Sequence, residues 1–307
     1  MSAYRNILVI VDPTAHEQPA VDKAAILAAK FAARLELFVC DTQSARESRL
    51  FAQSLKGAHP FDAKALVETI AVPLRAKGLD VTTEVAWTES LDAGLVARVC
   101  RGTADLVVKD THHHSLAQRT FLSNTDWQLI RGCTVPLLLT KQTAWAAAPR
   151  LIAAIDPEHV NDKPAQLDRV IMTHASQLSD ALSGDLHVLH AYLPAAIAAS
   201  ATAAPLGGVF VSEEDLRQER EARMDSVKRV TDPWHIDDAH IHLELGGPAA
   251  TLPLAADNLH ADVIVMGAVS RRGLKRVLMG STAEDVLERL PCDALIVKPP
   301  GFADRAA

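Results

Sequence analysis

The sequence predicts two α/β domains in tandem, each a doubly wound, five-stranded parallel sheet. Short apolar runs such as Val263–Met266 alternate with alanine-rich helical patterns along the chain, which is typical of parallel strands covered on both faces. The chain also repeats itself, because the apolar strand ending in Asp-Pro at Arg5–Pro13 returns at Arg150–Pro157. A length of 307 residues is enough for two domains, each with its own hydrophobic core.

Further pairs of segments set the order of elements in each copy. Leu35–Asp41 matches Asp185–Ala191, and Ala104–Lys141 matches Ala261–Pro299. The first domain, 1–143, is expected to hold strands near 6–12, 35–40, 80–87, 105–110 and 136–141, with helices near 18–34, 62–77, 90–101 and 125–132. The second domain, 150–307, is expected to hold strands near 151–156, 185–192, 240–245, 262–267 and 293–298, with helices near 163–182, 212–231, 249–260 and 281–290. Right-handed crossovers between such strands make both sheets parallel.

Composition excludes several classes of protein. Apolar residues make up 49% and charged residues 22%, as in globular rather than disordered chains. A net charge of −7 argues against a general nucleic-acid binder. The four cysteines are widely spaced and predict small buried residues of a reducing compartment. Strand-like sequence begins close to Met1, and the apolar stretch 194–211 is too short to span a bilayer, so a cytoplasmic protein is expected.

The segment after Met266 has the features of a phosphate-binding loop. It follows a buried strand, contains glycines that permit close backbone approach, and leads into a helix whose free N–H groups favour anions. Ligands usually bind at this end of open α/β sheets. The residues concerned are Gly267, Gly273, Gly280, Ser281 and Thr282, with basic side chains at Arg271, Arg272, Lys275 and Arg276.

This segment resembles the universal stress protein signature, G-x2-G-x9-G-[ST]. Gly267, Gly280 and Ser281 match it, whereas Ser270 stands at the second glycine. The resemblance covers nearly the whole chain and implies two flavodoxin-like (Rossmann-like) domains. The first-half THHH…NTDW segment and the KPPGF ending look most like tandem E-type members. The resemblance also implies an ATP site, with Mg, in the second domain, where Ser270 would crowd the phosphates.

By that resemblance, Asp156 would contact adenine or ribose, the Ala191 backbone would meet adenine, and Met266 and Gly267 would flank the base and ribose. Ser270, Gly280, Ser281 and Thr282 would lie at the phosphates. Independently of the resemblance, the basic charge of Arg271, Arg272, Lys275 and Arg276 would suit a phosphate ligand or an acidic partner. Structural alternatives stay open for these residues: an Asp-Pro turn at Asp156, core packing for Met266, a bare helix cap at Ser281–Thr282 and a solvated loop around Arg271.

The first copy lacks this cradle, because Asp110–Asp126 contains no glycine. Asp12, which matches Asp156, is expected to be a turn residue there. The run His112–His114 cannot direct all its imidazoles at one ion, and His187 and His190 are three apart on a strand rather than two. No metal site is therefore expected.

The function expected from the sequence is that of a non-enzymatic, ligand-responsive stress regulator with an adenine-nucleotide site in the second domain. Slow ATP hydrolysis is one alternative, although no nucleophile–base set stands out. Binding of an apolar or lipid-like ligand is another, motivated by Ser270 and the apolar insertion 194–211. By the resemblance, the two domains would form an intramolecular pseudo-dimer. A homodimer and protein partners stay open, whereas no membrane is expected as a partner.

Overall fold

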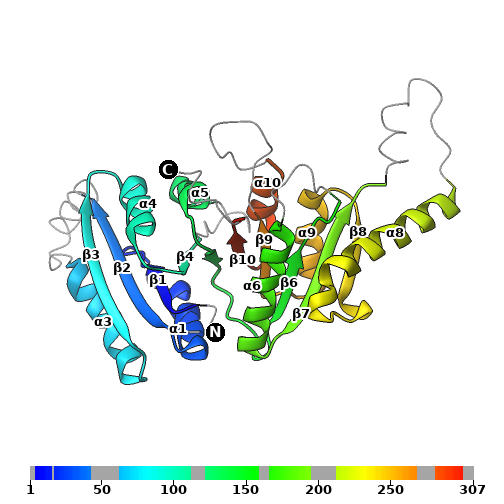
Figure 1. Ribbon diagram of the computed structural model, residues 1–307. Helices are drawn as coiled ribbons and strands as arrows, with labels where there is room; N and C mark the ends of the chain where they lie inside the picture. The colour runs from blue at the N-terminus through cyan, green and yellow to red at the C-terminus, as the bar shows by residue number, and fades with distance from the viewer. Residues whose placement is uncertain are drawn as a thin grey trace. The chain divides into compact units, whose positions relative to one another are not determined.

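A computed structural model describes residues 4–15, 17–42, 62–111, 122–158, 166–194, 212–267 and 281–299. The chain separates into two compact units (Figure 1). The first comprises Met1–Ala146 together with Asp293–Ala307, and the second comprises Ala147–Cys292. The domain limits 1–143 and 150–307 expected from the sequence stay a prediction.

The first unit is built on a parallel sheet in the order β3-β2-β1-β4-β5. Its strands are β1 (Asn6–Ile10), β2 (Arg34–Thr42), β3 (Val81–Thr88), β4 (Leu106–Asp110) and β5 (Leu137–Thr140). The helices between them are α1 (Pro19–Phe31), α3 (Ala63–Ala76), α4 (Leu91–Arg101) and α5 (Asn124–Gly132). One further strand, β10 (Asp293–Val297), pairs antiparallel with β5, Leu295 lying opposite Leu138.

The second unit has a parallel sheet in the order β9-β6-β7-β8. Its strands are β6 (Arg150–Ala154), β7 (Asp185–Tyr192), β8 (Ile241–Leu245) and β9 (Val263–Gly267). Its helices are α6 (Leu167–Leu182), α8 (Glu213–Thr231), α9 (Pro248–Asn258) and α10 (Ser281–Arg289), with short 3-10 turns η2 (Asp232–Trp234) and η3 (Asp238–His240).

The α/β fold class and the order of elements predicted from the sequence are confirmed, with ends that agree within a few residues. Local chemistry explains this agreement. The side chains of Asp62, Ser90, Ser123 and Ser212 each accept a backbone N–H at the start of a helix, as N-caps do. Strands β4 and β10 are buried along their whole length, as apolar runs of parallel or covered strands should be.

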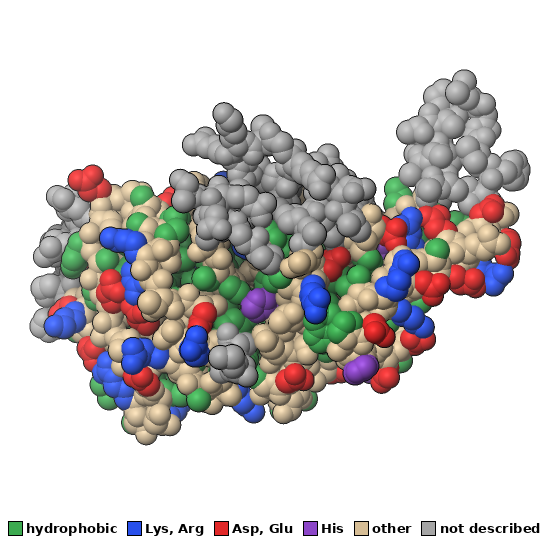
Figure 2. Space-filling view, in the orientation of Figure 1, with side chains coloured by type: hydrophobic (Ala, Val, Ile, Leu, Met, Phe, Trp, Pro, Cys, Tyr) green, Lys and Arg blue, Asp and Glu red, His purple; other side chains and the backbone are tan. Residues whose placement is uncertain are grey.

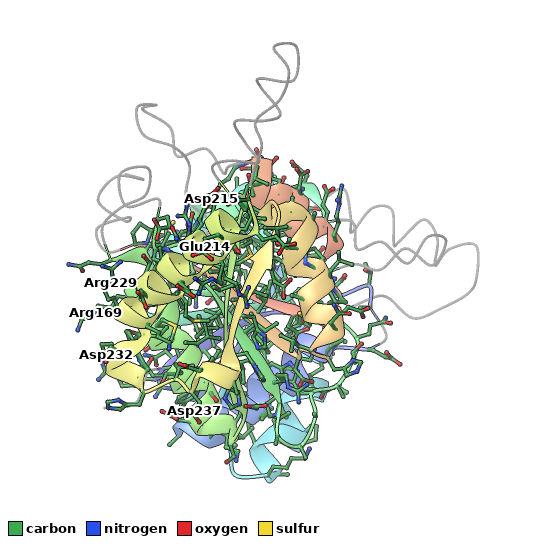
Figure 3. The ribbon with its side chains drawn as sticks, turned by 90° about the vertical axis from the view of Figure 1, so that its right-hand side faces the viewer. Arg169, Glu214, Asp215, Arg229, Asp232 and Asp237 are labelled. Atoms are coloured by element: carbon green, nitrogen blue, oxygen red, sulfur yellow. The ribbon has the colours of Figure 1, made fainter. Side chains whose placement is uncertain are left out.

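The surface carries intermixed acidic and basic side chains (Figure 2). Helix α8 shows the pattern clearly: Glu214 and Asp215 lie at its start and Arg229 near its end (Figure 3), which suits the helix dipole. Three of the cysteines are buried as expected, but Cys100 is exposed. Among the described residues, none of the helices combines the length and apolar character needed to cross a membrane.

Candidate functional site

Each sheet has a topological switch point, where the connections that follow two neighbouring strands run to opposite sides of the sheet. In the first unit this point lies between β1 and β4, and in the second between β6 and β9. The carboxyl ends of these strands are where open α/β sheets bind ligands. Both units therefore offer a candidate site at an equivalent place in the sheet.

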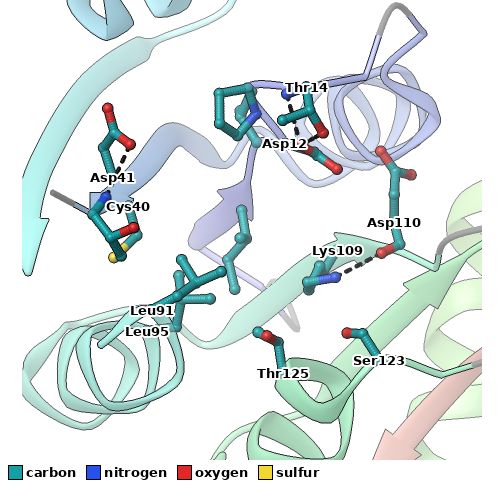
Figure 4. A pocket seen from close by; sticks show the side chains of 14 residues that line it. Asp12, Thr14, Cys40, Asp41, Leu91, Leu95, Lys109, Asp110, Ser123 and Thr125 are labelled. Atoms are coloured by element: carbon teal, nitrogen blue, oxygen red, sulfur yellow. Dashed lines mark hydrogen bonds between the residues drawn. The ribbon is translucent and has the colours of Figure 1, made fainter. Parts of the chain in front are cut away.

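The first unit has a pocket of about 250 Å³ at this place (Figure 4). Leu91 and Leu95 of α4 line it beside the ends of β1, β2 and β4. Its polar lining consists of Asp12, Thr14, Cys40, Asp41, Thr42, Lys109, Asp110, Ser123 and Thr125. The absence of glycine in Asp110–Asp126 predicts that the first copy has no phosphate cradle. It does not predict that a pocket with a different lining is present there.

A buried ion pair occupies the start of α5 beside this pocket. Lys109 Nζ lies 2.7 Å from Asp126 Oδ1, and the Asp126 side chain is fully buried. The other oxygen of Asp126 accepts hydrogen bonds from the Ser123 N–H at 2.7 Å and from its hydroxyl at 2.8 Å. The helix N-terminus, which would attract an external anion, therefore already faces a carboxylate of the chain itself.

Two further carboxylates of this pocket make structural contacts. Asp110 Oδ1 accepts the Ala20 N–H at 2.7 Å and the Thr140 hydroxyl at 2.6 Å, and burial raises the pKa of this carboxyl. Asp12 Oδ1 accepts from the Thr14 N–H at 2.8 Å and its hydroxyl at 2.6 Å. The second pattern is the turn expected for Asp12.

The lining of the first-unit pocket is thus unfavourable for a phosphate. Asp12, Asp41 and Asp110 face it, and Lys109, the one lysine among the described lining residues, is already paired with Asp126. An added phosphate would meet like charges there in a partly desolvated place.

In the second unit, the predicted residues Asp156, Ala191, Met266 and Gly267 come together at one edge of the sheet. Asp156 follows β6, Ala191 lies near the end of β7, and Met266 and Gly267 end β9; β6 pairs with both β7 and β9. The Asp156 N–H donates to Asp168 Oδ1 at 3.1 Å, while the Asp156 side chain is 41% exposed. Met266 is buried, as core packing requires.

Gly267 has a packing role whatever binds here. A Cβ at this position would lie 2.6 Å from Leu167 Cδ2, so the glycine lets the end of β9 approach the start of α6. Ser281 and Thr282 begin α10, and Thr282 is exposed. Ser270, Arg271 and Gly280 lie outside the described residues, as does the run His112–His114.

A histidine and an arginine that were not among the predicted site residues also lie at this end of the sheet. His190 is buried, its Nδ1 lying 3.2 Å from the Ile155 carbonyl and 3.8 Å from Asp156 Oδ1. Burial lowers the pKa of His190, so its imidazole is neutral at neutral pH. Arg223 of α8 pairs with Glu158 at 2.8 Å and with Glu219 at 2.9 Å near this end of β6. The sequence gives little indication that Arg223 lies here, because α8 follows the insertion 194–211.

Aligning the two copies strand by strand and helix by helix exposes a set of linked differences. Matching β4 with β9 pairs Lys109 with Met266 and Asp110 with Gly267. Matching α5 with α10 pairs Asp126 with Ala283. Asp41 corresponds to Tyr192, because the Val11 N–H donates to the Phe38 carbonyl in the first unit and the Ile155 N–H donates to the Leu189 carbonyl in the second. At these positions the second unit lacks both the ion pair and the two additional carboxylates of the first.

Comparison with known proteins gives relatives along the whole chain. The chain is 26% identical over 309 residues to universal stress protein E of Photorhabdus laumondii, covering 98% of this chain and 97% of that protein. It is 24% identical over 314 residues to universal stress protein E of Escherichia coli K12, covering 97% and 95%.

Solved structures agree. A functionally unknown protein of Pseudomonas aeruginosa PAO1 superposes with a TM-score of 0.79 at 26% identity, covering 99% of this chain and 96% of that one. A universal stress protein from Archaeoglobus fulgidus has a TM-score of 0.67 at 15% identity, with 97% and 99% covered, and so shares the fold. The universal stress protein family model matches residues 3–141 and again 161–298. The chain therefore belongs to the universal stress protein family, as a member with two tandem family domains similar to the E-type proteins.

Proposed function

We propose that this chain is a cytoplasmic, non-enzymatic stress regulator that binds an adenine nucleotide, ATP with Mg or AMP, in its second unit. The nucleotide would lie across the carboxyl ends of β6, β7 and β9, and its phosphates would meet the start of α10. Nucleotide binding would act by changing the affinity for a protein partner or the oligomeric state of the chain.

The contrast between the two copies carries the proposal. In the first unit, Asp126 supplies the negative charge at the helix start, and Lys109 neutralises it. In the second unit Ala283 and Met266 stand at these positions, so the carboxylate that bonds to the N-cap residue in the first unit and its lysine have no counterparts there, although Glu284 lies in the first turn of α10. A helix N-terminus without such a carboxylate favours an external anion.

The charge of the two linings supports the same assignment. Tyr192 and Gly267 stand where the first unit has Asp41 and Asp110, which removes two carboxylates from the end of the sheet where the phosphates would approach. Arg223 lies on this side as well, but Glu158 and Glu219 already pair with it, so it does not favour the phosphate. Asp156 remains, and its exposed carboxylate can accept hydrogen bonds from a ribose or an adenine amino group.

The test is isothermal titration calorimetry of the untagged, nucleotide-free chain with Mg-ATP, AMP and adenosine. We expect one nucleotide per chain and loss of binding in Gly280→Val, where a side chain would fill the cradle. Ala283→Asp transplants the first unit's carboxylate to α10. It should weaken ATP by at least about 10-fold and adenosine much less, because only ATP brings charge to that carboxylate.

A matched pair of variants provides the control. Thr282 and Thr125 stand at equivalent places in α10 and α5, and Thr125 lines the first-unit pocket. Thr282→Val should weaken ATP, whereas Thr125→Val should leave it unchanged. If Thr125→Val weakened ATP binding and Thr282→Val did not, the nucleotide would be assigned to the first unit. A chain that bound none of the three ligands would contradict the proposal.

The same samples separate regulation from slow hydrolysis. We expect no phosphate release above that of ATP alone in long incubations. Release that disappears in Asp156→Ala would establish the hydrolase instead. Binding of an apolar probe by a chain that ignores ATP would favour the lipid-like ligand.

A further inference from the structure

Three histidines and an aspartate gather at the opposite end of the second sheet from the proposed nucleotide site. Asp185 and His187 lie two apart at the start of β7, so both side chains lie on one face of the sheet. His240 and His242 lie two apart at the end of η3 and the start of β8. Because β7 and β8 are paired in parallel, with Leu189 opposite His242, the two short patterns lie side by side.

Three of these residues direct ligand atoms at one another. Asp185 Oδ2 lies 3.0 Å from His187 Nε2, and Asp185 Oδ1 lies 3.1 Å from His240 Nε2. One ligand atom from each residue falls within 4.8 Å of the others. Ligands that are each about 2.0–2.2 Å from one tetrahedral zinc ion are themselves separated by roughly 3.3–3.6 Å, so small side-chain rotations would complete the geometry.

The fourth residue, His242, fixes the orientation of the His187 ring. His187 Nδ1 lies 2.9 Å from His242 Nε2. If His187 Nε2 carries its lone pair to a metal, its Nδ1–H can donate to His242. Metal-binding histidines usually have such a partner for the second ring nitrogen, because it sets the tautomer and the orientation of the ring.

Burial and access also suit a metal. The side chain of His187 is only 9% exposed, whereas those of His240 and Asp185 are 34% and 41% exposed. The cluster is therefore anchored on its inner side and open to solvent on its outer side, which leaves a coordination position for water. Arg150 Nε approaches Asp185 Oδ2 at 3.4 Å and would compete with the ion for that oxygen, which limits the affinity.

We propose that Asp185, His187 and His240 form a binding site for one Zn²⁺ ion, with His242 orienting His187. Two imidazoles and one carboxylate form a donor set suited to a borderline transition metal rather than to Mg²⁺ or Ca²⁺, which prefer oxygen. The ion would join β7 to the η3–β8 segment and so stabilise the outer edge of the second sheet. This site is independent of the nucleotide proposal.

The full-length, untagged, metal-stripped chain is titrated with ZnCl₂ in a calorimeter. Elemental analysis after dialysis then gives the amount of zinc bound per chain. All variants carry His112→Ala, His113→Ala and His114→Ala, so that this histidine run contributes nothing. We expect one zinc per chain. His187→Gln and His240→Gln should each weaken binding by more than about 100-fold, and His242→Gln by about 10- to 100-fold.

His260→Asn is the matched control, because His260 is an exposed histidine of the same unit and asparagine tolerates its positive φ. It should leave zinc binding unchanged. Circular dichroism checks that each variant folds, and Co²⁺ in place of Zn²⁺ should give the intense visible absorption of a tetrahedral site. A chain that takes up no stoichiometric zinc, or whose zinc survives both His187→Gln and His240→Gln, would overturn the proposal.

Discussion

At the scale of single residues, an ion pair beside the first-unit pocket is almost entirely withdrawn from water. The side chains of Lys109 and Asp126 are 10% and 0% exposed. A buried pair of this kind contributes little over a well-packed apolar pair, but either partner alone leaves an uncompensated charge. The second copy shows the apolar alternative, because Met266 and Ala283 stand at the same places.

This contrast predicts a non-additive set of substitutions. Asp126→Ala should lower the free energy of unfolding by about 3–5 kcal/mol, because Lys109 keeps a buried charge. Lys109→Met combined with Asp126→Ala should recover most of that loss. Urea unfolding of the single and double variants measures this difference. Asp238→Ala, which removes a surface partner of Lys228, should change little. A double variant less stable than both singles would contradict the argument.

At the scale of elements, β10 is the strand whose placement matters most. Asp293, its first residue, lies 2.8 Å from Lys23 Nζ and also accepts from the Lys141 N–H and from Trp145 Nε1, both at 2.8 Å. Lys298, just after β10, donates to the Ile130 carbonyl at 2.6 Å. These contacts attach the end of the chain to α1, α5 and the segment after β5, all within the first unit.

Truncation after Cys292 should therefore destabilise the first unit. It removes the antiparallel partner of β5 and leaves Lys23 buried without its carboxylate. We expect faster amide hydrogen exchange in 4–42 and 122–142, with little change in 166–194. Truncation after Pro299, which keeps β10, is the control and should change neither region. Exchange that increases only in the second unit would show that β10 stabilises that unit instead.

The elements also show what the sequence could and could not predict. Apolar runs and N-cap residues act locally, so helices such as α5 and α8 were predicted closely. The antiparallel partner of β10 is set by contacts between distant segments, which no local pattern encodes. The histidine cluster cannot be predicted from either strand alone, because Asp185-x-His187 and His240-x-His242 meet only where β7 pairs with β8. The predicted phosphate loop around Ser270 lies outside the described residues and stays a prediction.

At the scale of the whole molecule, the two units should respond oppositely to mild acid. In the second unit, burial lowers the pKa of His174 to about 4 and also lowers that of His190. The unfolded chain therefore binds more protons than the folded one between about pH 6.5 and pH 4, and stability falls as the pH falls through this window. In the first unit, burial raises the pKa of Asp110 and Asp293, so these two groups take up protons on folding and add stability as the pH falls. The hydrogen bond from Arg75 lowers the pKa of Glu68 to about 2, and this group opposes them only below about pH 4.5.

The second unit should consequently unfold first on acidification. Urea unfolding followed by hydrogen exchange at pH 7 and pH 5 should show 166–194 losing protection relative to 4–42. His174→Gln should reduce the change in the second unit, because that side chain no longer takes up a proton on unfolding. His174 contributes on the order of 1 kcal/mol across the window, since its ring is only partly withdrawn from solvent. Equal losses in both units, unaffected by His174→Gln, would mean that other charges dominate the acid response.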